Sequence, residues 1–134
     1  MLDESFYREQ IIDLYENPLN RGELDPADFS YEEDNPLCGD VIRIDVRLDD
    51  NGRVTEVAWS GDGCAISQAS ASLLTEEIKG MTLDEVKNFD KETLLELVGV
   101  PLSMARVKCA LLSLKVLKAG AYGIPDKNIM RDRD

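Results

Sequence analysis

The sequence contains no histidine and only three cysteines among its 134 residues. Without histidine it cannot form a Ser-His-Asp or Cys-His catalytic arrangement, and it carries neither a dinucleotide-binding glycine fingerprint nor a P-loop. No apolar run approaches the roughly 20 residues of a membrane-spanning helix. The opening stretch, "MLDESFYREQ", lacks the basic segment and the cleavage site of a signal peptide. We therefore expect a cytoplasmic protein that does not bind membranes and is not an independent hydrolase or oxidoreductase.

Positive charge is also scarce. The chain has 15 Lys and Arg against 27 Asp and Glu, which gives a net charge of −12 and a sequence pI near 4.4. Such a field repels phosphate backbones, and no basic cluster offsets it, so we expect no nucleic-acid partner. An acidic surface suits a partner protein with a basic face, but it is equally typical of solubility or of adaptation to salt or heat. Charge alone does not decide between these interpretations.

The number of cysteines limits what their sulfur atoms can do. Three is an odd number, and disulfides are rare in the cytoplasm, so a disulfide framework is not expected. The remaining roles are buried apolar side chain, metal ligand or reactive thiol. Their positions in the predicted fold must distinguish these roles.

A β-hairpin over residues 41–48 and 53–60 is the clearest structural pattern. In "VIRIDVRL", apolar residues alternate with charged ones, as in a half-buried strand. Asn51-Gly52 follows as a tight turn, because both positions tolerate positive φ. "VTEVAWS" then returns as the second strand, with Thr55, Val57 and Trp59 expected on one face.

Helical periodicity surrounds this hairpin. Asp3 begins an N-terminal helix that ends near Glu16, and Gly120 is expected to end the last helix. The expected helices are 3–16, a segment from "GDGCA" to Gly80, two short helices capped by Thr82 and Asp90 with a stop at Gly99, and 103–119. Residues 19–37 show no period and are interpreted as an irregular arm, and 121–134 as a loose tail. The predicted fold is α+β, one domain over 1–134 with a small antiparallel sheet packed against about five helices.

The hairpin brings two of the cysteines together. Cys38 precedes the first strand and Cys64 follows the second, and in a hairpin these two points are neighbours. Asp40 lies at the same end of the sheet, separated from Cys38 by Gly39 alone, and Gly63 flanks Cys64. Cys109 joins them if the last helix packs with its N-terminus at that end. Three thiols and one carboxylate would complete a tetrahedral metal site, although their spacing matches no standard zinc finger.

The predicted surroundings favour thiolates. Cys64 and Cys109 lie near helix N-termini, where partial positive charge stabilises an anion, and Arg106 and Lys108 add charge beside Cys109. A lone cysteine is nevertheless more often a small buried hydrophobe. From the residues alone, the metal interpretation and the core interpretation both stay open.

Three segments carry a family resemblance. Together "NPLCGD", "GDGCAISQASASLLTEEIKG" and "VKCALLSLKVLKAG" resemble the IscU/NifU N-terminal family of iron–sulfur cluster assembly proteins, including its SufU branch, over about residues 3–121. The resemblance implies a scaffold that accepts persulfide sulfur from a cysteine desulfurase and builds or passes on a [2Fe–2S] cluster to apo iron–sulfur acceptor proteins. It implies that one of Cys38, Cys64 and Cys109 accepts the sulfur, and that these cysteines and Asp40 bind iron, or zinc when no cluster is present.

The sequence departs from the family pattern at two places. Classical IscU proteins have a histidine ligand where this chain has Lys108, and a basic residue there resembles SufU. The segment between Cys64 and Cys109 is, however, shorter than in zinc-type SufU proteins. A zinc-dependent sulfurtransferase that activates the desulfurase without holding a cluster is therefore the alternative function. "VPLSMARVKC" keeps only fragments of the motif that binds an Hsp70-type chaperone, which puts that partner in doubt.

Overall fold

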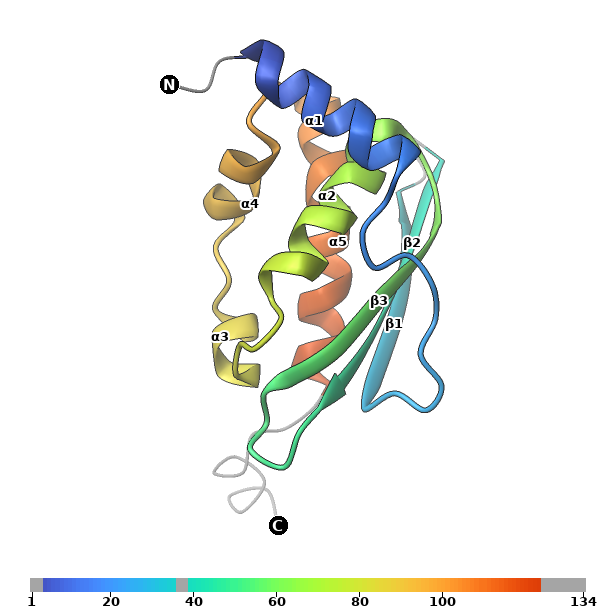
Figure 1. Ribbon diagram of the computed structural model, residues 1–134, viewed down its shortest axis with the longest axis vertical. Coiled ribbons are helices and arrows are strands. Elements are labelled where there is room, and N and C mark those ends of the chain that lie inside the picture. Colours follow the sequence, from blue (N-terminus) through green and yellow to red (C-terminus); the bar gives the residue numbers. More distant parts are fainter. Residues whose placement is uncertain (1–3, 36–38, 124–134) are drawn as a thin grey trace.

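The computed structural model describes residues 4–35 and 39–123. Helices α2 and α5 lie against one face of the sheet, and α3 and α4 lie beyond them, away from the strands (Figure 1). The predicted α+β class is confirmed. The elements are α1 (Glu4–Glu16), β1 (Phe29–Asn35), β2 (Asp40–Leu48), β3 (Val54–Asp62), α2 (Ala65–Glu77), α3 (Leu83–Lys87), α4 (Lys91–Val98) and α5 (Met104–Tyr122).

The sheet has three antiparallel strands in the order β1-β2-β3. In the hairpin, Val41 pairs with Asp62 at one end and Arg47 with Glu56 at the other. The pairing then shifts register between Arg47 and Leu48. The ends of β2 and β3 that meet at Val41 and Asp62 are the part of the sheet from which the candidate site is built.

The prediction that residues 19–37 form an irregular arm is wrong for 29–35. These residues are β1, which pairs with β2 from Phe29 opposite Val46 to Asn35 opposite Asp40. Phe29 is the one buried side chain in this strand, and the others are exposed or partly exposed. Backbone pairing at a sheet edge leaves no apolar alternation in the sequence, so the pattern gave no signal for this strand.

A single apolar layer holds the sheet to the helices. It includes Trp59, Ile44, Leu74 and Leu117, all with at most 1 % of their surface exposed. A second, smaller cluster attaches α1 through Ile11 and Leu14, which pack against Ala69 and Val98. Among the described residues, no helix is both long enough and apolar enough to cross a bilayer.

The boundaries of α3 and α4 confirm the predicted caps at Thr82 and Asp90 and the predicted stop at Gly99. Thr82 forms a capping box with Glu85, and Asp90 accepts a hydrogen bond from the amide of Glu92. Gly99 ends α4 in the left-handed conformation with φ 77°.

The prediction that Gly120 ends the last helix is wrong. Helix α5 continues to Tyr122, two residues into the expected tail, and residues 124–134 lie outside the described residues. A Cβ atom on Gly120 would lie 2.8 Å from Cδ1 of Phe29. This glycine therefore lets β1 cross close to α5 and does not serve as a helix stop.

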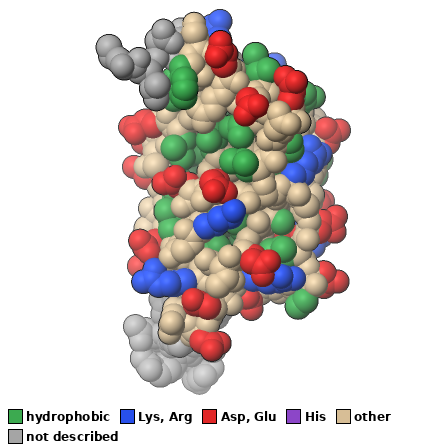
Figure 2. All heavy atoms as spheres, in the orientation of Figure 1, with side chains coloured by type: hydrophobic (Ala, Val, Ile, Leu, Met, Phe, Trp, Pro, Cys, Tyr) green, Lys and Arg blue, Asp and Glu red, His purple; other side chains and the backbone are tan. Residues whose placement is uncertain are grey.

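Charged side chains of both signs lie on the face of the molecule drawn in Figure 2. Figure 2 shows acidic side chains distributed over the face it presents, with basic side chains interspersed among them. On that face no basic patch gathers.

Candidate metal centre

Residues from three parts of the chain meet at the end of the sheet drawn uppermost in Figure 1. Asp40 begins β2, Cys64 lies immediately before α2, and Cys109 lies in the second turn of α5. One ligand atom from each of the three side chains lies within 4.8 Å of the others. The hairpin pairing places Asp40 beside the β3–α2 turn, and the packing of α2 against α5 brings Cys109 to the same point.

The Asp40 carboxylate is fully buried, with 0 % of its surface exposed. Its Oδ1 accepts a hydrogen bond of 3.0 Å from the backbone amide of Cys64, and its Oδ2 lies 3.9 Å from Cys64 Sγ. One oxygen therefore fixes the carboxylate to the turn, while the other faces a thiol. Burying a carboxylate costs free energy unless it is paired or bound to a metal, so this placement requires an explanation.

Gly63 makes room for that carboxylate. A Cβ atom at this position would lie 2.6 Å from Asp40 Oδ1 and 2.6 Å from Ser67 Oγ. Any other residue would push Asp40 or α2 away. Gly39 on the other side of Asp40 has φ +72°, a conformation that favours glycine, with open space where a side chain would begin.

The two described thiols differ in their access to solvent. Cys64 is partly exposed and occupies the N-cap position of α2, but its side chain does not cap the helix. The Cys64 sulfur is thus left available for other chemistry at a helix N-terminus, where an anion is stabilised. Cys109 is completely buried in α5.

Among the described residues, Arg106 is a cation that interacts with both of these thiols. The pKa of Arg106 is raised above the ordinary value, chiefly by the electrostatic interaction and hydrogen bond with Cys64, and further by Cys109. Sequence reasoning placed Arg106 beside Cys109 but did not include it among the site residues. The available signal was its position three residues before Cys109, one helical turn away.

The other predicted site residues are less defined. Lys108 is exposed on α5, and its role as an electrostatic neighbour of Cys109 stays a prediction. Cys38 lies outside the described residues. The predicted set of Cys38, Asp40, Cys64 and Cys109 is therefore represented in the structure by its last three members.

The donors present suit a borderline or soft cation. Thiolates and one carboxylate are ligands of zinc and of iron in sulfur-rich sites. Two sulfur ligands of one tetrahedral zinc lie about 3.8 Å apart. The ligand atoms here lie within 4.8 Å of one another, so small side-chain movements bring them to the separation that zinc requires. The buried carboxylate, with Oδ2 directed at a thiol, is the observation that supports a cation here.

Comparisons with known proteins agree with this chemistry. A model of the NifU-like N terminal domain matches residues 6–130. The chain is 38 % identical to the zinc-dependent sulfurtransferase SufU of Bacillus subtilis, over 87 % of this chain and 90 % of that one. It is 35 % identical to the iron–sulfur cluster assembly scaffold protein IscU of Haemophilus influenzae, over 84 % of this chain and 90 % of that one.

A solved structure shares the fold. It comes from Fervidobacterium islandicum and is described as an iron–sulfur cluster assembly scaffold protein for the SUF system. The TM-score is 0.70 with 29 % identity, and the alignment covers 84 % of this chain and 94 % of the other.

Proposed function

The chain belongs to the family of NifU-like N-terminal domains, and on that premise we propose that it is an iron–sulfur cluster assembly scaffold and sulfur acceptor. The observation that carries the proposal is the meeting of Asp40, Cys64 and Cys109 within 4.8 Å at one end of the sheet. The cluster is the cargo, and zinc is the ion expected at the same residues when no cluster is held.

Cys38 is proposed as the fourth ligand. It lies two residues before Asp40 in the chain, so the two are joined by a short covalent path through Gly39. Two residues span at most about 7 Å, which is compatible with ligands of one ion. With Cys38 included, the donors are three sulfur atoms and one oxygen atom, the number needed for a tetrahedral site.

Sulfur acceptance requires a thiolate at this site. The thiolate attacks the terminal sulfur of a donor persulfide, a new S–S bond forms, and the original S–S bond breaks to release the donor cysteine as a thiolate. The Arg106 guanidinium stands at Cys64 and Cys109, where it stabilises this negative charge before and after transfer. A cysteine desulfurase is the class of partner that supplies such a persulfide, and apo iron–sulfur proteins are the acceptors.

Asp40 is proposed as the ligand that dissociates. A carboxylate oxygen is a harder and weaker ligand for a sulfur-loving metal than a thiolate. The hydrogen bond from the Cys64 amide holds Oδ1, so the side chain stays in place when Oδ2 leaves the ion. The vacated position then accepts an incoming sulfur or a ligand from the acceptor protein.

A zinc-dependent sulfurtransferase is the second candidate, and two observations favour it. Lys108 stands where classical IscU proteins have a histidine ligand, and a protonated ammonium group cannot bind a metal. The similarity to B. subtilis SufU points in the same direction. In that function the zinc is permanent and the protein stimulates the desulfurase without holding a cluster.

Anaerobic purification followed by metal and sulfide analysis separates the two functions. A scaffold, incubated with a desulfurase, cysteine, ferrous iron and a thiol reductant such as dithiothreitol, which reduces the persulfide sulfur to sulfide, gains iron and sulfide in equal amounts and transfers them to an apo acceptor. A zinc sulfurtransferase keeps one zinc per chain, accelerates the desulfurase and transfers no iron. Protein that binds neither zinc nor a cluster, and does not affect the desulfurase, contradicts both candidates.

A further inference from the structure

The segment between α1 and β1 runs alongside the outer edge of β3. The amide of Gly22 donates to the carbonyl of Trp59 at 2.8 Å, and the amide of Trp59 donates to the carbonyl of Asn20 at 2.9 Å. These bonds form a short parallel bridge that centres on Arg21 and Trp59. The backbone that carries Arg21 is thus fixed to the strand that leads into the Cys64 turn.

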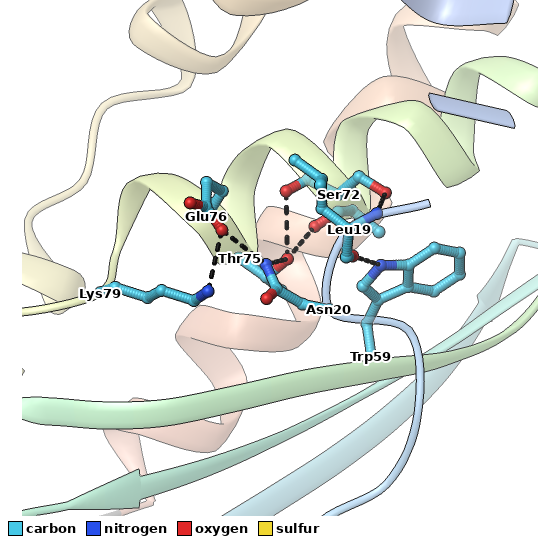
Figure 3. A network of polar contacts seen from close by, with 8 residues as sticks. Leu19, Asn20, Trp59, Ser72, Thr75, Glu76 and Lys79 are labelled. Atoms are coloured by element: carbon cyan, nitrogen blue, oxygen red, sulfur yellow. Dashed lines mark hydrogen bonds and ion pairs between the residues drawn. The ribbon is translucent and has the colours of Figure 1, made fainter. Parts of the chain in front are cut away.

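The same segment is also tied to α2 and to the core (Figure 3). The amide of Leu19 donates to Ser72 Oγ at 3.1 Å, and the indole of Trp59 donates to the carbonyl of Leu19 at 2.8 Å. The Asn20 side-chain amide donates to Thr75 Oγ1 at 3.1 Å. Because Trp59 and Thr75 are completely buried, these anchors give Arg21 a rigid base.

From this base the Arg21 guanidinium reaches the turn that precedes Cys64. It lies over the ring of Trp59, 4.9 Å from its centroid, and donates to the carbonyl of Gly61 at 2.7 Å. Its other nitrogen donates to Gln68 Oε1 at 2.9 Å. Gln68, with only 4 % of its surface exposed, in turn donates to the carbonyl of Gly63 at 2.9 Å.

The β-sheet holds only part of this turn: Gly61 and Asp62 end β3 and pair with Ile42 and Val41, and Gly63 follows them. Gly61 has φ +130°, and a side chain there would collide with the carbonyl of Val41. Gly63 has no room for a side chain beside Asp40. The side chain of Asp62, between them, is exposed and accepts a hydrogen bond from the amide of Gly63. Gly63 lies beyond the paired residues of β3, and a glycine there leaves the backbone directly before Cys64 conformationally free unless other residues fix it.

We propose that Arg21 is a positioning residue for Cys64, acting through Gln68 and the carbonyl groups of Gly61 and Gly63. The planar guanidinium bonds one carbonyl directly and orients the glutamine that bonds the other, so both sides of Asp62 are fixed. This proposal rests on the proposed function only in taking Cys64 as a reacting thiol. Its test needs no metal, cluster or desulfurase, so its failure is separate from a failure of that function.

The test measures alkylation of Cys64 in reduced, metal-free protein by iodoacetamide, with the modified peptides quantified by mass spectrometry over a range of pH. The variants are Arg21→Ala, Gln68→Ala and the double variant, with Arg21→Lys as the conservative change. Arg47→Ala is the matched control. Arg47 also binds the α1–β1 segment, through the carbonyl of Pro26 at 2.7 Å, and pairs with Glu56 at 2.8 Å, but at the other end of the sheet.

We expect Arg21→Ala to raise the limiting alkylation rate of Cys64 at high pH about 5- to 10-fold, the effect of losing one charged hydrogen bond from a locally opening turn. The rate at Cys109 and the rates in Arg47→Ala stay unchanged. The alkylation rate of Cys64 in Arg21→Lys lies between those of wild type and Arg21→Ala, because lysine keeps the positive charge but lacks the planar guanidinium that donates two hydrogen bonds at once. The double variant does not exceed Arg21→Ala, because Gln68 acts in the orientation that Arg21 gives it, but it exceeds Gln68→Ala, which keeps the direct bond from Arg21 to the Gly61 carbonyl.

Three results would overturn the proposal. One is an equal alkylation rate of Cys64 in Arg21→Ala and Arg47→Ala. Another is a parallel rise at Cys109, which would show general loosening. The third is additivity in the double variant, which would mean that Arg21 does not act through Gln68. If Arg21→Ala does not fold, Arg21→Lys and Gln68→Ala are compared with Arg47→Ala by the same criteria.

Discussion

Strand β2 begins with one aspartate, and another directly follows its end, and the structure uses them in opposite ways. Asp49, at the hairpin turn, is exposed, and its Oδ1 accepts hydrogen bonds from the amides of Asn51 and Arg53, both at 2.9 Å. It does what an aspartate in a turn usually does. Asp40, at the other end, is fully buried, accepts one amide bond from across the hairpin, and directs its second oxygen toward a thiol.

The difference separates a carboxylate that stabilises the local fold, Asp49, from one that is placed in the candidate metal site, Asp40. Asp49 completes a local turn, and its interactions lie within five residues of the chain. Asp40 sits among groups from β2, the β3–α2 turn and α5: the Cys64 amide binds its Oδ1, and its Oδ2 faces the Cys64 thiol, with Cys109 close by. A buried carboxylate that faces thiols from other elements is the donor arrangement that suits a metal ion.

The largest expected effect comes from removing a sulfur ligand. Cys64→Ser should weaken zinc binding by more than about 100-fold, since loss of even a supporting residue costs 10- to 100-fold. Asp49→Ala, at the hairpin end, should bind zinc as wild type does. Competition with a chromophoric chelator measures both. Equal zinc affinity in Cys64→Ser and wild type would place the ion elsewhere.

Gly63→Ala tests the space around Asp40. The added methyl group would lie 2.6 Å from Asp40 Oδ1, so the carboxylate must move, and we expect zinc affinity to fall about 10- to 100-fold. Gly52→Ala at the hairpin is the matched control. Gly52 has φ +76° and open space around it, so that change should cost about 1 kcal/mol of stability and leave zinc affinity unchanged. A loss of zinc affinity in Gly52→Ala as well would contradict the assignment of the zinc site to the end of the sheet that holds Asp40.

Asp45 sharpens the comparison, because it is buried like Asp40 but satisfied by the protein. Burial acts to raise its pKa, but hydrogen bonds from Ser30, the Leu24 amide and Arg43 outweigh it, so the pKa is lowered. Asp45→Asn should therefore lower the free energy of unfolding at pH 7 by about 1–3 kcal/mol. A carboxyl with a depressed folded pKa stabilises above its unfolded pKa near 4, and this contribution is lost as pH falls through the folded pKa.

Urea unfolding at several pH values checks this expectation. The stability difference between wild type and Asp45→Asn should be constant from pH 7 to about pH 5 and shrink below about pH 4. A difference that grows on acidification has the wrong sign for the proposed cause.

The smallest effect is expected at Lys108. Lys108→Met should leave the zinc content unchanged and slow sulfur acceptance only a few-fold, since one exposed charge is worth less than about 1 kcal/mol. Arg106→Met, which removes the cation in contact with both thiols, should slow acceptance more. Stopped-flow measurement of sulfur transfer from a persulfurated desulfurase compares the rates of the two variants. Loss of zinc in Lys108→Met would show that this residue has been assigned the wrong role.

The sequence predicted those parts of the molecule that local chemistry determines. Alternation and Asn51-Gly52 located the hairpin, and the hairpin alone placed Asp40 next to Cys64. Strand β1 was missed because an edge strand with one buried side chain, Phe29, has no apolar period. Gly120 was misread because a glycine needed for close packing looks the same in sequence as one that ends a helix.

The supporting residues of the site were beyond sequence reasoning for a different reason. Arg21 lies 47 residues from Gln68 and 40 from Gly61 in the chain. Only the course of the segment between α1 and β1 along β3 brings them together, and that course depends on tertiary contacts that no local pattern records.

Cluster transfer from Asp40→Ala, with Asp49→Ala as control, tests the central claim that Asp40 is a metal ligand kept for release. Each protein is loaded anaerobically with a [2Fe–2S] cluster and mixed with an apo ferredoxin-type acceptor, and transfer is followed by circular dichroism. We predict that Asp49→Ala transfers at the wild-type rate, whereas Asp40→Ala retains the fold, holds its cluster and transfers about 10-fold more slowly, a barrier change near 1.4 kcal/mol. Transfer from Asp40→Ala at the wild-type rate would contradict the account.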